Sequence, residues 1–120
     1  MKDSLDKIEI NGVTYVPENT VAPELDGMKY CIVRTYSAGV FAGYVARREG
    51  QEVDILQARR LWYWEGAASL SQLAMSGTSK PDKCKFPNVM SKVTVTQAIE
   101  IIECTLAAKE SIEAVTIWKS

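Results

Sequence analysis

Alternation of hydrophobic and polar residues dominates the first half of the chain and predicts a series of strands. The first segment, residues 7–16, reads KIEINGVTYV, in which Asn11 and Gly12 separate two alternating runs. Asn-Gly favours a type I′ turn, because both positions need positive φ. The expected register pairs Ile10 with Val13, Glu9 with Thr14 and Ile8 with Tyr15. An isolated hairpin is barely stable, so we expect this one to pack on the main body or on another subunit.

Further extended segments follow a linker at 17–27 that contains two prolines. Four of them, at 28–36, 40–47, 52–56 and 58–64, predict a strongly curved antiparallel meander, with a barrel as its extreme form. Gly43 lies inside the second strand and predicts a β-bulge or the close approach of another backbone or a ligand. Two later strands are expected at 91–96, with Val93 and Val95 inward, and at 98–104, and a last one at 115–118.

Helical periodicity is confined to two short segments. Residues 66–76 place small and apolar residues on one side, and Gly77 is a natural helix terminator. Thr105 is a suitable N-cap for a second helix at 106–114. Its expected buried stripe is Ala108, Ile112 and Val115, and its expected exposed ion pair is Lys109 with Glu113. The fold class is therefore α+β, with an N-terminal hairpin arm and linker at 1–27 and a core domain at 28–120.

Composition excludes several functions. The 120 residues carry a net charge of −1, which argues against general DNA binding. The N-terminus lacks the apolar core of a signal peptide, and no run approaches the length of a membrane span, so we expect a cytoplasmic protein. The sequence contains no histidine, which removes the commonest general base. Its three widely spaced cysteines suit neither a metal site nor a disulfide framework and are expected to be ordinary buried thiols.

The richest stretch for binding is residues 58–81, ARRLWYWEGAASLSQLAMSGTSKP. If its start is extended, Arg60, Trp62 and Trp64 share one face, and Arg59, Leu61 and Tyr63 share the other. An accessible Arg60-Trp62-Trp64 face would stack a nucleobase and hold a phosphate. The alternative, in which both tryptophans lie in the core and the arginines are solvated, carries about equal weight.

Neighbouring residues extend this candidate site. A helix beginning at Gly66 would offer free N–H groups to an anion, although the same serines also suit plain helix packing. Arg34, on a mostly apolar strand face, is expected to have an anionic partner, which is a ligand, Asp54 or Glu65. The candidate ligand-binding residues are Arg34, Tyr36, Arg59, Arg60, Trp62, Trp64, Ser69, Ser71, Gln72 and Lys80. We assign no catalytic residue, no metal ligand and no cofactor.

The runs MKYCIVRTYSAGVFAGY, ARRLWYWEGAASLSQLA, GTSKP, CKFP and SIEAVTIW resemble a family of small uncharacterised phage and prophage proteins. Small phage proteins without enzymatic motifs often counter host defences, and one class sequesters nucleotide-derived immune signals. The resemblance implies a phage-encoded sponge, homo-oligomeric and non-catalytic, for a small anionic nucleotide of the cyclic nucleotide or cyclic ADP-ribose type. The alternative hypothesis is a protein–protein interaction module that inhibits a host protein through the Trp-rich face.

Overall fold

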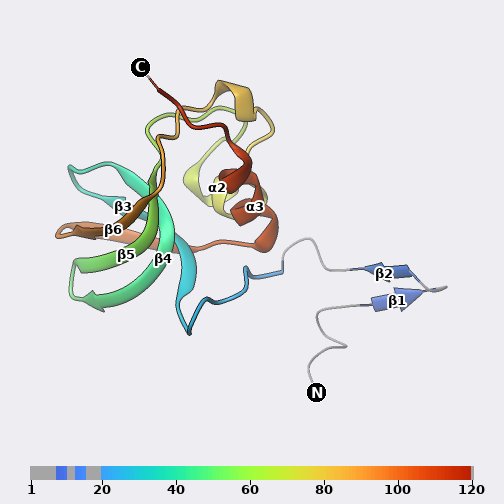
Figure 1. The fold of residues 1–120 in the computed structure, drawn as a ribbon, viewed down its shortest axis with the longest axis horizontal. Helices are drawn as coiled ribbons and strands as arrows, with labels where there is room; N and C mark the ends of the chain where they lie inside the picture. The colour runs from blue at the N-terminus through green and yellow to red at the C-terminus, as the bar shows by residue number, and fades with distance from the viewer. Residues whose placement is uncertain (1–7, 11–12, 16–19, 120) are drawn as a thin grey trace.

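The structure is a computed structural model that describes residues 8–10, 13–15 and 20–119, and Figure 1 shows its arrangement. Two kinds of element are present, strands in two sheets and short helices. In chain order they are β1 (Ile8–Ile10), β2 (Val13–Tyr15), β3 (Lys29–Thr35), β4 (Val40–Glu49), β5 (Glu52–Arg60), α2 (Leu70–Ser76), the 3-10 helix η1 (Pro81–Lys83), β6 (Met90–Val95), β7 (Ala98–Glu103) and α3 (Leu106–Ala114).

The main sheet is antiparallel and has the strand order β6-β5-β4-β3-β7. Its centre is the predicted meander β3-β4-β5. The strands β6 and β7 are joined by only two residues, Thr96 and Gln97, yet they lie at opposite edges of the sheet. The sheet must therefore curve strongly to bring its edges together there. Since β6 and β7 do not pair, it stays open and is not a closed barrel, and the α+β class is confirmed (Figure 1).

Gly43 has both of its predicted features. The register between β4 and β5 shifts opposite this residue, where Gln57 adopts a φ of 51°. A Cβ on Gly43 would lie 2.6 Å from Cγ2 of Ile55 and 2.8 Å from the carbonyl oxygen of Leu56. Only a residue without a side chain allows this approach. The pairing of β5 with β4 continues on both sides of the bulge. The two extended segments expected at 52–56 and 58–64 therefore form one strand, which ends at Arg60.

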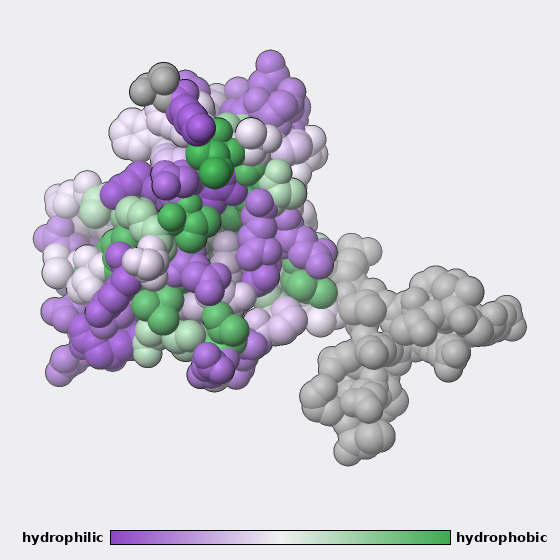
Figure 2. Space-filling model, viewed as in Figure 1, coloured by the Kyte–Doolittle hydropathy of each residue, from purple (hydrophilic) through white to green (hydrophobic). Residues whose placement is uncertain are grey.

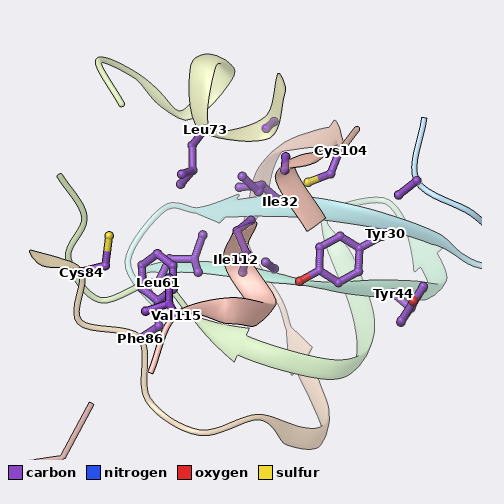
Figure 3. Packing of buried hydrophobic residues seen from close by; sticks show 14 residues of the cluster. Tyr30, Ile32, Tyr44, Leu61, Leu73, Cys84, Phe86, Cys104, Ile112 and Val115 are labelled. Carbon is purple, nitrogen blue, oxygen red and sulfur yellow. The ribbon is translucent and has the colours of Figure 1, made fainter. Parts of the chain in front are cut away.

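One face of the sheet is covered by α2 and α3, and the residues buried there form what we call the helix-side cluster (Figure 3). Tyr30 and Tyr44 project from β3 and β4 and meet edge to face with ring centroids 5.2 Å apart. The helices contribute Leu73 from α2 and Ile112 from α3. Loops complete the cluster with the fully buried ring of Phe86.

The opposite face encloses a second set of buried residues, the inner cluster, to which the strands alone contribute. Its buried members are Cys31, Val33, Phe41, Val53, Ile55, Ala58, Val95 and Ala98. Val93 and Val95 both point into this cluster, which confirms their predicted inward orientation. Since no helix contributes to the cluster, the curvature of the sheet is what removes these side chains from water.

The second predicted helix is confirmed in its bounds and in its details. Thr105 is the N-cap, and its hydroxyl accepts a hydrogen bond of 3.1 Å from the Ala108 N–H. Ala108 and Ile112 are buried with Val115, as the stripe predicts. The Lys109 ammonium lies 3.0 Å from a Glu113 carboxylate oxygen. The strand expected at 115–118 is reduced to one bridge, between Phe86 and Ile117.

The segment 20–22 belongs structurally with the core. Ala22 is buried, and its N–H donates to the Cys104 carbonyl at 3.0 Å. The Leu106 N–H donates to the Thr20 carbonyl at 2.7 Å. This segment therefore lies against the end of β7 and the start of α3.

The predicted hairpin register is confirmed for β1 and β2, which form a sheet of their own. Its expected turn at Asn11 and Gly12 lies outside the described residues. Cys31, Cys84 and Cys104 are buried free thiols, as expected. Within residues 8–10, 13–15 and 20–119, no helix is long and apolar enough to cross a membrane.

Candidate functional site

Three segments that are distant in sequence meet just beyond the end of β5. The N–H groups of Trp62 and Tyr63 both donate to the Lys85 carbonyl, at 3.1 and 3.3 Å, and the Lys85 N–H donates back to the Tyr63 carbonyl at 2.8 Å. The Trp118 N–H donates to the Phe86 carbonyl at 3.0 Å. Main-chain hydrogen bonds thus tie the stretch after β5, the loop after η1 and the C-terminal tail into one unit.

Exposed aromatic side chains gather on this unit. The Lys85 ammonium lies 5.7 Å from the ring centroid of Tyr63 and 5.7 Å from that of Trp118. Trp62 is 62 % exposed, Tyr63 44 % and Trp118 37 %, and Ile117 next to Trp118 is exposed as well. We call these five residues, Trp62, Tyr63, Lys85, Ile117 and Trp118, the aromatic surface. Elsewhere, on the face seen in Figure 2, hydrophobic residues form separate patches between hydrophilic ones.

Tyr63 is held in place by more than Lys85. Its hydroxyl donates to a Glu65 carboxylate oxygen at 2.7 Å. This hydrogen bond, made by the protonated phenol, raises the pKa of Tyr63. The ring therefore stays neutral and oriented, and its apolar face remains available for contact.

Arg59 has a structural environment. It is 4 % exposed, and its guanidinium donates to the carbonyls of Pro87, Ile112, Phe86 and Val115 at 2.7 to 3.0 Å. The same group lies over the Phe86 ring, 5.5 Å from its centroid. Burial without a carboxylate partner lowers the pKa of Arg59. The donors that the sequence assigned to a ligand are used to hold the loop after η1 and the end of α3 onto the sheet.

Arg60 lies on the other side of the sheet from Arg59. It pairs across the ladder with Phe41 of the inner cluster, and its guanidinium lies 4.4 Å from the centroid of that ring. One nitrogen donates to the Ala38 carbonyl in the turn between β3 and β4. Within the described part of the chain its other nitrogens have no hydrogen-bond partner. Arg60 is half-buried, and its remaining guanidinium N–H groups are available to a ligand.

Arg34 and Arg60 do not converge. Arg34 pairs with Val40 on the helix side of the sheet, whereas Arg60 pairs with Phe41, the next residue along β4. Successive residues of a strand point to opposite faces, so the two guanidinium groups lie on opposite faces. Both were candidate ligand-binding residues, and this register does not let them bind the same phosphate.

The anionic partner of Arg34 is a protein carboxylate. Its Nε donates to Glu100 of β7 at 2.9 Å, and both side chains are partly exposed. The two candidates named from the sequence are used elsewhere, since Asp54 binds Arg47 and Glu65 binds Tyr63. Tyr36, two residues beyond Arg34, is largely exposed.

The start expected for the first helix is wrong, so no helix N-terminus lies at Gly66 to form the expected anion site. Helix α2 begins at Leu70, not at Gly66, and its N-cap is Ser69. The Ser69 hydroxyl accepts from the Gln72 N–H at 3.1 Å, and the Gln72 side chain accepts from the Ala68 N–H at 2.8 Å. These side chains cap the helix themselves. The physical reason for the late start is Gly66, whose φ of 87° is not helical.

The remaining predicted residues are separated from Arg60. Trp64 packs partly buried against the helix-side cluster, so it does not share an exposed face with Trp62. The expected alternation fails there because β5 ends at Arg60. Ser71 is exposed on α2. Lys80 is exposed in a loop held against Gly66, where the Ser79 N–H donates to the Gly66 carbonyl at 3.2 Å.

Lys85 and Trp118 are the members of the aromatic surface that sequence reasoning missed as site residues. Lys85 looked like one of several solvated loop lysines, and Trp118 looked like the end of a strand. The only local signal was the aromatic-basic composition of 58–64, since the contacts of Lys85 with Tyr63 and with Trp118 span 22 and 33 residues of sequence. Two hollows between described residues, one beside Arg48 and one beside Lys29, have no predicted ligand-binding residue in their lining.

A family model described as a domain of unknown function, DUF6948, matches residues 28–112. The comparisons with curated proteins and with solved structures gave no significant match. The matched region starts at the residue before β3 and runs to Ile112 in α3, so it contains the whole main sheet, α2 and all but the last two residues of α3.

Proposed function

This chain belongs to the DUF6948 family, and we propose that it is a non-catalytic binding module whose aromatic surface docks onto a protein partner. The observation that carries the proposal is the exposure of Trp62, Tyr63 and Trp118, of which Tyr63 and Trp118 have their rings beside the Lys85 ammonium. Exposure of tryptophan and tyrosine side chains to water is energetically unfavourable. These residues are enriched among those that dominate the binding energy at protein interfaces.

The shape of the surface favours a protein over a small molecule. Sites for small ligands are concave and enclose most of the ligand. Two hollows among the described residues lie beside β7, and no member of the aromatic surface lines either of them. A surface of exposed rings fixed by main-chain hydrogen bonds suits a partner that supplies its own complementary hollow.

The experiment compares the wild type with Trp62→Ala in quantitative affinity capture from host lysate, followed by affinity measurement on the purified pair. We expect the captured partner to bind Trp62→Ala at least roughly 30-fold more weakly, which corresponds to about 2 kcal/mol at a hot spot. The matched control is Tyr36→Ala, which also removes an exposed ring but lies outside the aromatic surface. Equal binding by all three proteins would exclude the aromatic surface as the docking site.

A small anionic nucleotide is the second candidate, favoured by Arg60 and Trp62. The Arg60 guanidinium keeps donors for a phosphate, and the exposed ring of Trp62 follows two residues later. Thermal unfolding is measured against cyclic nucleotides, cyclic ADP-ribose isomers and linear mononucleotides. A ligand at a hundred times its dissociation constant adds about 2.7 kcal/mol. We expect Arg60→Ala to abolish the shift, whereas no shift with any nucleotide would exclude this candidate.

The biological setting rests on the resemblance to phage and prophage proteins. We propose that the chain is phage-encoded, that it acts in the host cytoplasm, and that it counters host defence. With a protein partner it would inhibit a host defence protein, and with a nucleotide it would sequester the immune signal. In the second case the nucleotide is recovered unchanged after denaturation, which distinguishes a sponge from an enzyme.

A further inference from the structure

A groove runs along the free edge of β7, away from the aromatic surface. Its larger part is a hollow of about 580 Å³, lined on one side by residues 98–101 and on the other by Arg48, Gly50 and Gln51. Side chains alternate between the two faces of a strand. A hollow lined by four consecutive residues of β7 therefore faces the edge of the strand, where its main chain has no neighbouring strand.

The groove continues toward the other end of β7. A second hollow of about 280 Å³ is lined by Gly27, Lys29, Cys31, Val45, Ile101 and Glu103. Ile101 lines both hollows, so they adjoin, and the alternate residues of β3 and β7 that line the second one place it on the inner face of the sheet, beside the edge of β7. Cys31, Val45 and Ile101 belong to or pack against the inner cluster and give this part an apolar lining. The Lys29–Glu103 ion pair, with 3.1 Å between its charged atoms, is polar and already satisfied.

The opposite wall of the groove is also a strand edge. The pairing of β3 with β4 begins at Lys29 and Val45, but β4 continues to Glu49. The last four residues of β4 therefore have β5 on one side and no strand on the other. The Ala98 N–H at the start of β7 donates to the Gln51 carbonyl at 3.0 Å, so the two walls are joined there. Beyond it, along 99–103, the free edge of β7 can accept an extended segment by strand addition.

The chain also contains a two-stranded sheet that would be stabilised by adding to such a strand edge. Strands β1 and β2 pair only with each other, and each has three residues. A two-stranded sheet of this size is marginal in water, and three or more strands are needed for independent stability. We propose that the β1–β2 hairpin of a second copy of this chain adds to the free edge of β7.

The connection to the core argues for a second copy over the chain's own hairpin. Val21 bridges Thr105 in antiparallel fashion, so the chain that precedes Thr20 is directed toward α3 and away from β7. Only four residues, 16–19, join β2 to Thr20. A reversal within four residues would place β2 beside 20–22, next to 104–106, and would leave the edge at 98–103 unpaired. Exchange between two copies meets no such limit and gives two identical contacts.

The test measures the oligomeric state of full-length proteins by sedimentation velocity over a range of concentrations. The wild type is expected to dimerise. Ile99→Lys places an ammonium group on the exposed edge, where charge blocks strand addition, and is expected to weaken the dimer roughly tenfold or more. The matched control Met75→Lys changes an exposed residue of α2 and is expected to leave the dimer intact.

A second variant acts on the hairpin instead of the edge. Glu9→Pro removes a ladder donor from β1 and is expected to give a monomer with the core fold retained by circular dichroism. Glu9→Pro still has an intact β7 edge, and Ile99→Lys still has an intact hairpin, so a mixture of the two is expected to form a one-to-one complex. A wild type that stays monomeric, or a dimer that survives Glu9→Pro, overturns the proposal even if Ile99→Lys fails to fold.

Discussion

The helix-side cluster and the inner cluster lie on the two faces of one sheet but are assembled differently. Strand residues alone bury the inner cluster, and the curvature of the sheet closes it. The helix-side cluster draws on strands, both helices, the loop at Phe86 and the tail at Val115. Alternation along a strand is enough to specify the first cluster, whereas the second depends on contacts that only tertiary structure creates.

Two arginines that are adjacent in sequence illustrate the difference between the two clusters. Arg59 enters the helix-side cluster and binds four carbonyls from the loop and from α3. Arg60 turns to the other face and covers the Phe41 ring at the margin of the inner cluster. Residues of the same type, one position apart, thus organise the core in one case and border it in the other.

The largest expected effect is that of Arg59→Met. Four buried or half-buried carbonyls lose a donor, and those of Phe86 and Ile112 keep only the N–H groups of Trp118 and Val115. An unsatisfied buried group costs about 1–3 kcal/mol, so we expect a loss of roughly 4 kcal/mol in unfolding free energy from the other two carbonyls together. Denaturant unfolding measures it. The control, Arg60→Met, loses a cation–π contact of about 0.5–1 kcal/mol. Equal losses in the two variants would contradict the structural role of Arg59.

Alkaline pH tests the stability of both clusters, because each cluster contains a buried cysteine thiol. Burial raises the pKa of Cys31 to about 11 and that of Cys104 to about 12. The unfolded chain releases these protons near pH 9, whereas the folded chain keeps them, so stability is full below pH 9 and falls as the pH rises toward 11. We expect a loss of roughly 2 kcal/mol linked to Cys31.

Unfolding by denaturant in the presence of a reductant, from neutral pH to about pH 11, measures this loss. Cys31→Ala is expected to flatten the pH dependence of the unfolding free energy, whatever its effect at neutral pH. Cys104→Ala is expected to flatten it over a wider range, because the thiol in the helix-side cluster has the higher pKa. An unchanged slope in Cys31→Ala would show that its thiol titrates alike in both states.

Thr105→Ala is expected to have an intermediate effect. The Thr105 hydroxyl caps α3 and also donates to the Met75 carbonyl in α2 at 2.7 Å, so it connects the two helices of the helix-side cluster. We expect a loss of about 1.5 kcal/mol by thermal or chemical unfolding. Ser69→Ala removes the cap of α2 alone and is expected to cost less, about 0.5–1 kcal/mol. The reverse order would show that α3 contributes less than its contacts indicate.

The smallest expected effect is that of Arg34→Ala. Its pair with Glu100 is solvent-exposed, and such pairs contribute about 0.2–1 kcal/mol. A double-mutant cycle with Glu100→Ala isolates the pair, and moderate salt is expected to weaken it. A coupling energy well above 1 kcal/mol would indicate that this edge of the sheet is more important to the fold than its exposure suggests.

The sequence predicted those parts of the fold in which local chemistry and tertiary structure agree. The bounds of α3, its cap and its stripe follow from 3.6-residue periodicity and from Thr105. The bulge opposite Gly43 follows from the cost of glycine in a strand. The fusion of two segments into β5 was not predicted, because a bulge at Gln57 reads as a break in a simple alternating pattern.

The candidate site was predicted less well, for a physical reason. Arginine is equally suited to binding a phosphate and to binding several carbonyls, and only the fold shows that Arg59 does the second. Likewise, the direction of Trp64 changes because β5 ends early, and Lys85 joins Tyr63 and Trp118 only after the loop and the tail have folded. The sequence predicted an accessible Arg60-Trp62-Trp64 face, with burial of both tryptophans as an alternative of about equal weight, and of the two tryptophans only Trp62 is largely exposed.

The two-residue connection through Thr96 and Gln97 has a consequence for how the chain folds. Strands β3, β4 and β5 pair with their neighbours in sequence and can form early. Strands β6 and β7 pair with opposite edges of that meander, so both depend on its being formed first. Loop-closure entropy makes such non-local pairings late and slow. The pairing of the two edge strands is therefore expected to be the last step of folding. The amide protons of β6 and β7 are expected to exchange with solvent sooner than those of β4.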